Sequence, residues 1–157
     1  MTAPSFPAPA LVEQSARHLA VVRQRVAFDG IPALYDRAFP AIFGALGALG
    51  LAPLDAPLGV THGDSSSELD LSVAVPVAAP FSAHGEVTHE LLPAGTGATL
   101  LVRGDYAQLE AAYAHLYGWI ADQALTPLGV AWEQYLTEPE PGGDPALNET
   151  LIVVLVE

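Results

Sequence analysis

Several short segments of the chain alternate apolar and polar side chains, which is the pattern of a strand with one buried face. The clearest is residues 69–77, in which leucine or valine occupies every second position. The run at residues 151–156 is apolar throughout and predicts a central buried strand. Similar patterns predict strands over most of residues 13–26 and at residues 58–62, 86–92, 97–103 and 128–136.

Two longer segments repeat apolar residues every three or four positions, which favours helices with one buried stripe. They span residues 31–49 and 105–124. Proline suits the start of a helix, as at Pro32. Pro40 falls in the middle of the first helix, where we expect a kink or a restart because proline has no N–H to donate.

The second half of the sequence repeats landmarks of the first half in the same order. The tetrapeptide Pro-Leu-Gly-Val at residues 57–60 recurs at residues 127–130, each time after a predicted helix. We therefore predict an α+β fold of two tandem β-α-β-β units, forming one antiparallel sheet with both helices on one face. A central cleft is expected between the two halves, and such junctions are common sites for small ligands.

A length of 157 residues, of which 51% are apolar, suits one domain with a substantial core. We assign residues 13–157 to this domain, with halves of about 13–80 and 86–157, and residues 1–12 to a flexible leader. The leader lacks a signal-peptide pattern, and no apolar run reaches the roughly 20 residues of a membrane-spanning helix. We expect a cytoplasmic protein.

The chain is strongly acidic, with 18 Asp and Glu residues against five Arg and a formal net charge of −13. Such a surface repels phosphate backbones and anionic membranes, so neither a nucleic acid nor a membrane is expected as a partner. The absence of cysteine excludes disulfides and thiolate metal sites. We predict no metal and no cofactor, since the densest His and Glu cluster, at residues 84–90, spans a predicted loop-to-strand junction.

One carboxylate has an unusual aromatic setting. Glu133 follows Trp132 on a predicted strand, and Tyr135 comes two residues later. In a strand Glu133 and Tyr135 share one face, whereas Trp132 points to the other, where core packing competes with ligand contact. A carboxylate in apolar surroundings is costly unless it is paired, and a cation held against aromatic rings would offset that cost. The same Glu133 could instead transfer a proton, or simply face solvent.

Taken together, these features resemble a known family, the GyrI-like small-molecule-binding domain. This domain is also the effector-binding domain of multidrug-sensing bacterial regulators. The resemblance extends over roughly residues 13–157. The matching pieces, in order, are Leu92-Pro-Ala-Gly95, Gly104-Asp-Tyr106, Trp119-Ile120, Pro127-Leu-Gly129, Trp132-Glu-Gln-Tyr-Leu136 and the terminal strand from Glu149.

The resemblance implies a promiscuous pocket between the two halves that takes bulky, planar and often cationic molecules. It implies that Glu133 and Tyr106, the aromatic residue that opens the second helix, lie in this pocket. The candidate ligand contacts are Glu133, Tyr106, Trp132, Tyr135, Trp119 and His62. His62 stands where many relatives have an aromatic residue, which affects the expected shape of the pocket. The sequence has no helix-turn-helix segment, so we expect a stand-alone member of the family.

Three functions follow from the resemblance. The first is a binding protein for lipophilic, planar, cationic small molecules, in multidrug sequestration or sensing. The second is a hydrolase of cyclopropane-containing alkylating natural products, in which Glu133 activates water and Tyr135 assists as a polar group. The third is an inhibitor of DNA gyrase, with a protein as the partner. An exposed acidic stripe outside the cleft would favour the third.

Overall fold

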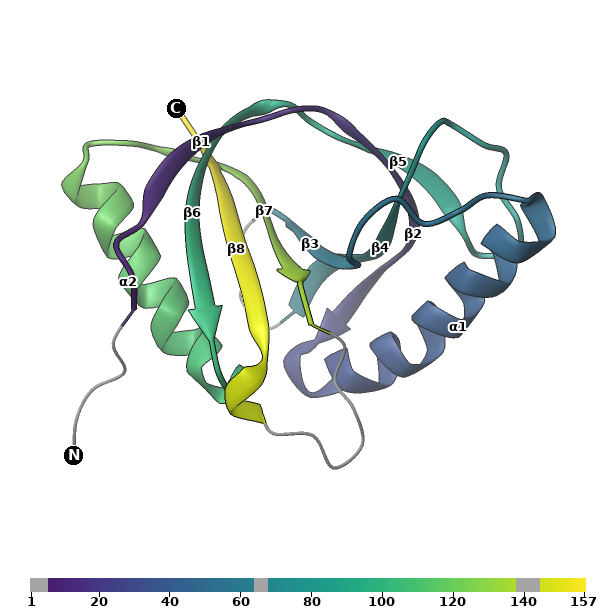
Figure 1. The fold of residues 1–157 in the computed structure, drawn as a ribbon, viewed down its shortest axis with the longest axis horizontal. Coiled ribbons are helices and arrows are strands. Elements are labelled where there is room, and N and C mark those ends of the chain that lie inside the picture. The colour runs from purple at the N-terminus through teal and green to yellow at the C-terminus, as the bar shows by residue number, and fades with distance from the viewer. Residues whose placement is uncertain (1–5, 64–67, 138–144) are drawn as a thin grey trace.

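The computed structural model describes residues 6–63, 68–137 and 145–157. Within these ranges the chain forms a sheet and two α-helices (Figure 1). The elements in chain order are β1 (Ala10–Gln14), β2 (Arg17–Ala27), η1 (Phe28–Gly30), α1 (Ile31–Leu49), β3 (Leu58–His62), β4 (Glu68–Val77), β5 (Thr88–Leu92), β6 (Gly95–Arg103), η2 (Tyr106–Gln108), α2 (Leu109–Asp122), β7 (Pro127–Tyr135), η3 (Pro145–Leu147) and β8 (Glu149–Val156), where η denotes a single 3-10 turn.

The strands form one antiparallel sheet in the order β1-β6-β8-β7-β3-β4-β2-β5. Each half of the chain supplies one β-α-β-β unit, β2-α1-β3-β4 and β6-α2-β7-β8. The two units meet where β3 pairs with β7, and Val60 lies opposite Trp132 in that pair. The predicted α+β fold of two tandem units in one antiparallel sheet is confirmed.

The sheet curves strongly, because its opposite edges are joined by very short connections. β1 lies at one edge and β2 next to the other, yet only two residues separate Gln14 from Arg17. The same is true of Leu92 in β5 and Gly95 in β6. Three peptide steps reach roughly 11 Å at most, so the two edges must approach each other. These two connections form the arch at the top of Figure 1.

The curvature gives the sheet an inner face that buries its own apolar core without help from a helix. Trp132 is the largest side chain in this inner core and is 1% exposed. The other buried members of the inner core are Leu19, Val21, Leu58, Val60, Ala74, Leu92, Val153 and Leu155. Side chains that alternate with these point to the outer face, where both helices lie.

Each helix packs on the outer face of its own half of the sheet. Leu34, Ala38 and Ile42 of α1 are buried against β2 and β4, and Ala112, Leu116 and Ile120 of α2 are buried against β6 and β8. The central strands β3 and β7 lie between the two helix-covered halves of the sheet (Figure 1). None of the described helices is long and apolar enough to span a membrane.

Several boundaries differ from the sequence prediction. The segment 13–26 contains parts of two strands, because the chain crosses from one sheet edge to the other after Gln14. β1 begins at Ala10, so the end of the segment assigned to the leader pairs with β6, whereas residues 1–5 lie outside the described ranges. α1 continues through Pro40 as one helix, so of the kink or restart that we expected there, the restart does not occur.

Candidate functional site

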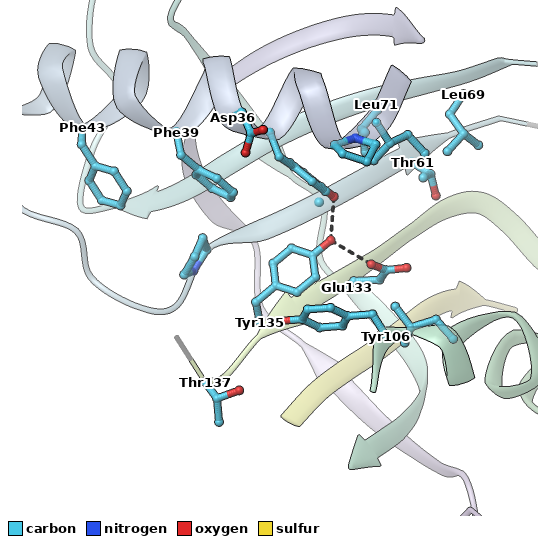
Figure 2. Close-up of a pocket in the computed structure, with 16 residues that line it drawn as sticks. Asp36, Phe39, Phe43, Thr61, Leu69, Leu71, Tyr106, Glu133, Tyr135 and Thr137 are labelled. Atoms are coloured by element: carbon cyan, nitrogen blue, oxygen red, sulfur yellow. Dashed lines mark hydrogen bonds between the residues drawn. The ribbon is translucent and has the colours of Figure 1, made fainter. Parts of the chain in front are cut away.

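A cavity of about 790 Å³ opens on the outer face of the sheet, between α1 and the turn that precedes α2. Strands β3, β4 and β7 form its floor, and α1 and η2 form its walls (Figure 2). This cavity is the central cleft that we predicted between the two halves. It is lined by Ile31, Pro32, Tyr35, Asp36, Phe39, Phe43, Pro57, Gly59, Thr61, Leu69, Leu71, Tyr106, Leu109, Glu133, Tyr135 and Thr137.

The half-buried carboxylate of Glu133 is held in the floor by two tyrosine hydroxyls. Tyr113, from α2, donates to Oε1 over 2.7 Å, and Tyr135, two residues along β7, donates to Oε2 over 2.8 Å. Both carboxylate oxygens therefore accept a hydrogen bond, as an ionised carboxylate can. Hydrogen bonds to a charged group are stronger than neutral ones, so the two phenols fix the position of the negative charge.

A third tyrosine extends this chain of hydrogen bonds into the first half of the molecule. The Tyr35 hydroxyl, from α1, lies 2.6 Å from that of Tyr135 (Figure 2). Because the Tyr135 proton is given to Glu133, Tyr35 must be the donor in this contact. Gly59 on β3 makes room for the pair, since a Cβ atom there would overlap the Tyr35 hydroxyl oxygen.

Aromatic rings cover much of the cavity wall. Along α1, Tyr35 stacks on Phe39 with ring centroids 5.6 Å apart, and Phe39 in turn stacks on Phe43 at 6.4 Å. The edge-to-face contacts of Tyr135 with Tyr35, at 5.8 Å, and with Tyr106, at 6.2 Å, connect this row to η2. The cavity thus offers planar apolar surfaces with a negative charge at their base.

Burial keeps the site tyrosines protonated. It raises the pKa of the Tyr135 and Tyr113 hydroxyls well above the ordinary value of 10.0, and the negative charge of Glu133 raises both further. Burial also raises the pKa of Tyr35. The pKa of Tyr106 is raised by burial first and by the Glu133 charge second. These hydroxyls therefore remain neutral hydrogen-bond donors across the physiological pH range.

The charged side chains that line the cavity are all acidic. Among the described residues that line it, Glu133 and Asp36 carry carboxylates, and none carries a basic group. A ligand that enters this cavity therefore meets aromatic faces and negative charge.

Three of the six ligand contacts proposed from the sequence line the cavity, namely Glu133, Tyr106 and Tyr135. The shared face predicted for Glu133 and Tyr135 is present. Trp132 points away from the cavity into the inner core, as the strand alternation had allowed. Trp119 does not line the cavity either, because it packs on the core between α2 and the sheet.

His62, the remaining contact proposed from the sequence, does not line the cavity either. On β3, the outer face is taken by Gly59 and Thr61, so His62 shares the inner face with Leu58 and Val60. Its Nε2 atom lies 3.1 Å from the hydroxyl of Ser72 and 3.4 Å from Oε2 of Glu90. His62 thus belongs to a polar network at one end of the inner core.

Sequence reasoning missed the contributions of Tyr35, Asp36, Tyr113 and Gly59 to the site. Tyr113 falls on the apolar stripe of its helix, so the sequence pattern made it resemble a core residue. The aromatic residues Tyr35, Phe39 and Phe43 recur at a spacing of four, which places them on one side of α1. This spacing is the sequence feature from which the aromatic wall of the cavity could have been predicted.

The sequence matches the family described as the GyrI-like small molecule binding domain over residues 7–156. A comparison with curated protein sequences gives no match. The match extends over both halves of the chain and includes every lining residue of the cavity.

Three solved structures illustrate the fold. The EcmrR C-terminal domain superposes with a TM-score of 0.83 at 23% identity, over 97% of this chain and 98% of that one. SAV2435 bound to tetraphenylphosphonium gives a TM-score of 0.69 at 14% identity, over 96% and 94% of the two chains. A protein described as a hydrolase from Listeria innocua gives 0.62 at 12% identity, over 95% and 91%. At these identities the likeness shows a shared fold.

Proposed function

Because the chain belongs to the GyrI-like small molecule binding domain family, we propose that its central cavity binds lipophilic, planar, cationic small molecules. The role would be sequestration or sensing of such compounds. The observation that carries this proposal is the fixed carboxylate of Glu133 at the base of an aromatic cavity without a basic lining residue in the described part of the chain.

Each part of the cavity favours a cation with a delocalised or shielded charge. The faces of Tyr106, Phe39 and Phe43 offer dispersion contacts and cation–π attraction. Glu133 supplies a full negative charge, but both of its oxygens already accept hydrogen bonds. A bulky cation can gain from that charge without displacing either tyrosine. The formal net charge of −13 would also concentrate cations near the protein.

The structural comparison supports the same ligand class. SAV2435, which shares the fold, was solved with tetraphenylphosphonium, a lipophilic cation with four aromatic rings. This compound is a suitable first probe for the present protein, because its charge is permanent and independent of pH.

The test is a calorimetric titration of the full chain with tetraphenylphosphonium, comparing wild type with Glu133→Gln. Removal of one nearby charge in a partly buried site is expected to weaken binding by roughly tenfold or more. Asp122→Asn is the matched control, because it removes one negative charge at the far end of α2, about 20 Å along the helix from the lining residue Leu109. Equal affinities of wild type and Glu133→Gln would contradict the proposal.

A hydrolase is the second candidate, and the contact between Glu133 and Tyr135 is the observation that favours it. A carboxylate beside a neutral phenol in an apolar cavity can accept a proton from water while the phenol orients the reacting groups. The water oxygen would bond to a cyclopropane carbon, one ring bond would break, and its electrons would move into a conjugated carbonyl that takes up a proton.

This candidate predicts turnover as well as binding. Mass spectrometry of a cyclopropane-containing dienone, incubated with a small molar fraction of protein, would show a product heavier by one water. Glu133→Gln would abolish its formation, whereas Asp122→Asn would not. Binding without any hydrated product would leave the protein as a binder of such compounds.

A further inference from the structure

The two carboxylates that line the cavity have very different surroundings. Glu133 lies in the floor and is held by two tyrosine hydroxyls. Asp36 lies on α1 and is exposed, and its carboxylate has no hydrogen bond or ion pair within the described ranges. We propose that Asp36 is an outer anionic contact, so that the cavity selects elongated dications whose bulky aromatic cation sits over Glu133 and whose second positive group sits beside Asp36. This inference rests on the proposed binding function.

The position of Asp36 on its helix directs it along the aromatic wall. Asp36, Phe39 and Phe43 follow a spacing of three and four residues, so they lie on one side of α1. Figure 2 shows the Asp36 carboxylate next to Phe39 on the side of α1 that faces the cavity. A ligand that extends from the floor along this wall reaches Asp36 as it leaves the cavity.

No basic side chain neutralises Asp36. The adjacent Arg37 donates to Glu86 and to Gln24, away from the cavity. The sequence has only five Lys and Arg residues in all, and three of the other four are paired with carboxylates elsewhere, as the pairs Arg17–Asp55, Arg23–Asp70 and Arg103–Glu149. The remaining one, Arg25, lies opposite Asp70 in the sheet. In a chain that pairs most of its arginines, an unpaired carboxylate at a binding cavity is available to a ligand.

The helix lacks one backbone donor next to Asp36. Pro40 lies inside α1, four residues after Asp36. Because proline has no N–H, the carbonyl oxygen of Asp36 lacks the donor that another residue at position 40 would supply.

The contributions of Asp36 and Glu133 to ligand affinity should depend differently on ionic strength. An exposed carboxylate is screened by dissolved ions, whereas a charge in the floor of the cavity is screened much less. The contribution of Asp36 to affinity should therefore be modest at low ionic strength and smaller at high ionic strength. The contribution of Glu133 should persist.

The experiment uses two probes that differ only in charge. The first is an alkyltriphenylphosphonium that carries a trimethylammonium group at the far end of its chain, and the second carries an uncharged tert-butyl group of the same shape there. The linker is lengthened one methylene at a time, and the length at which the second charge raises the affinity most gives the distance between the two charges. Calorimetric titrations compare wild type, Asp36→Asn, Asp36→Glu and the Asp122→Asn control.

We expect wild type to bind the best-fitting dication about twofold to fivefold more tightly than its tert-butyl counterpart, as for one exposed ion pair at a favourable distance. Asp36→Asn should remove this preference, so that the two probes bind this variant with nearly equal affinity. Asp36→Glu should retain the preference, and Asp122→Asn should behave as wild type. High salt should reduce the preference of wild type for the dication over the tert-butyl probe.

The inference fails in two recognisable ways. If Asp36→Asn weakens the binding of both probes equally, or of neither, Asp36 makes no local contact with the second charge. The proposed binding function is then still tested separately by Glu133→Gln. If no phosphonium probe binds to wild type, the binding function falls and the role of Asp36 falls with it.

Discussion

The hydroxyl of Tyr35 on α1 lies 2.6 Å from that of Tyr135 on β7, and this contact joins the two halves of the molecule at the binding cavity. Through Tyr135 it reaches Oε2 of Glu133. The orientation of the carboxylate therefore depends on both β-α-β-β units being in place. A change that separates the two hydroxyls should therefore affect ligand binding by altering the position of the carboxylate.

Gly59→Ala tests this dependence. The new methyl group would overlap the Tyr35 hydroxyl oxygen and lie 3.1 Å from that of Tyr135. We expect the free energy of unfolding to fall by about 1–3 kcal/mol, as for other overpacked sites, and tetraphenylphosphonium to bind more weakly than to wild type. Gly44→Ala is the control, because a Cβ atom there meets nothing within 4 Å and alanine favours the helix. Unchanged binding by Gly59→Ala would show that the hydroxyl contact does not support the site.

Trp132→Phe tests the assignment of Trp132 to the inner core. Its indole is 1% exposed and its Nε1 atom has no hydrogen-bond partner in the described structure, so phenylalanine loses volume and no hydrogen bond. We expect urea unfolding to show a loss of about 1–3 kcal/mol. Tetraphenylphosphonium should bind the folded variant within about twofold of wild type, since the side chain points away from the cavity. If the variant is stable but binds tetraphenylphosphonium much more weakly, Trp132 contributes to the binding site after all.

Stability should fall in alkaline solution because of the buried tyrosines. In the unfolded chain they ionise near the ordinary pKa of 10.0, whereas burial raises the folded pKa of Tyr113 and Tyr135 well above that value. Their contribution is complete below pH 10 and is lost as the pH rises toward the folded pKa. Urea unfolding between pH of about 9 and about 11 should show this decline, with a smaller slope in Tyr113→Phe. If the stability of Tyr113→Phe falls with pH as steeply as that of wild type, the assignment of Tyr113 as a buried, protonated tyrosine is wrong.

The polar network of the inner face should control stability in acid. Burial alone would raise the pKa of Glu90, but the His62 ring nitrogen 3.4 Å from Oε2, the hydrogen bond from Ser72 and the charge of Arg23 outweigh it and hold that pKa below 4.5. The carboxylate therefore stabilises the fold above pH 4.5, and this stabilisation is lost as the pH falls through the lowered folded pKa.

Glu90→Gln should therefore flatten the dependence of stability on pH below about 4.5 and lower stability at neutral pH. The measurement is urea unfolding at a series of acidic pH values. Glu110→Gln, which changes an exposed carboxylate on α2, serves as the comparison and should follow wild type. A Glu90→Gln curve parallel to that of wild type would show that the network does not titrate with folding.

The sequence by itself determined most of the elements and their order, although it merged the end of β1 and most of β2 into one predicted strand. Alternation in residues 69–77 and the apolar periodicity of residues 31–49 are local properties, and local backbone geometry converts them directly into strand and helix. The repeated tetrapeptide indicated two similar units. Strand alternation also placed Glu133 and Tyr135 on one face, and it left Trp132 to the other, as the structure has them.

Only the tertiary structure decided which residues from the two halves meet. Tyr35 and Asp36 reach the cavity because β3 pairs with β7 and thereby brings α1 beside the strand that carries Glu133. His62 faces the inner core because of the pairing of β3 in the sheet, where a shift of one residue would exchange the two faces. The closure of the curved sheet depends on contacts between distant segments, such as Gln14 with Gly95. Pairing register and sheet closure are long-range properties, and no local pattern in the sequence encodes them.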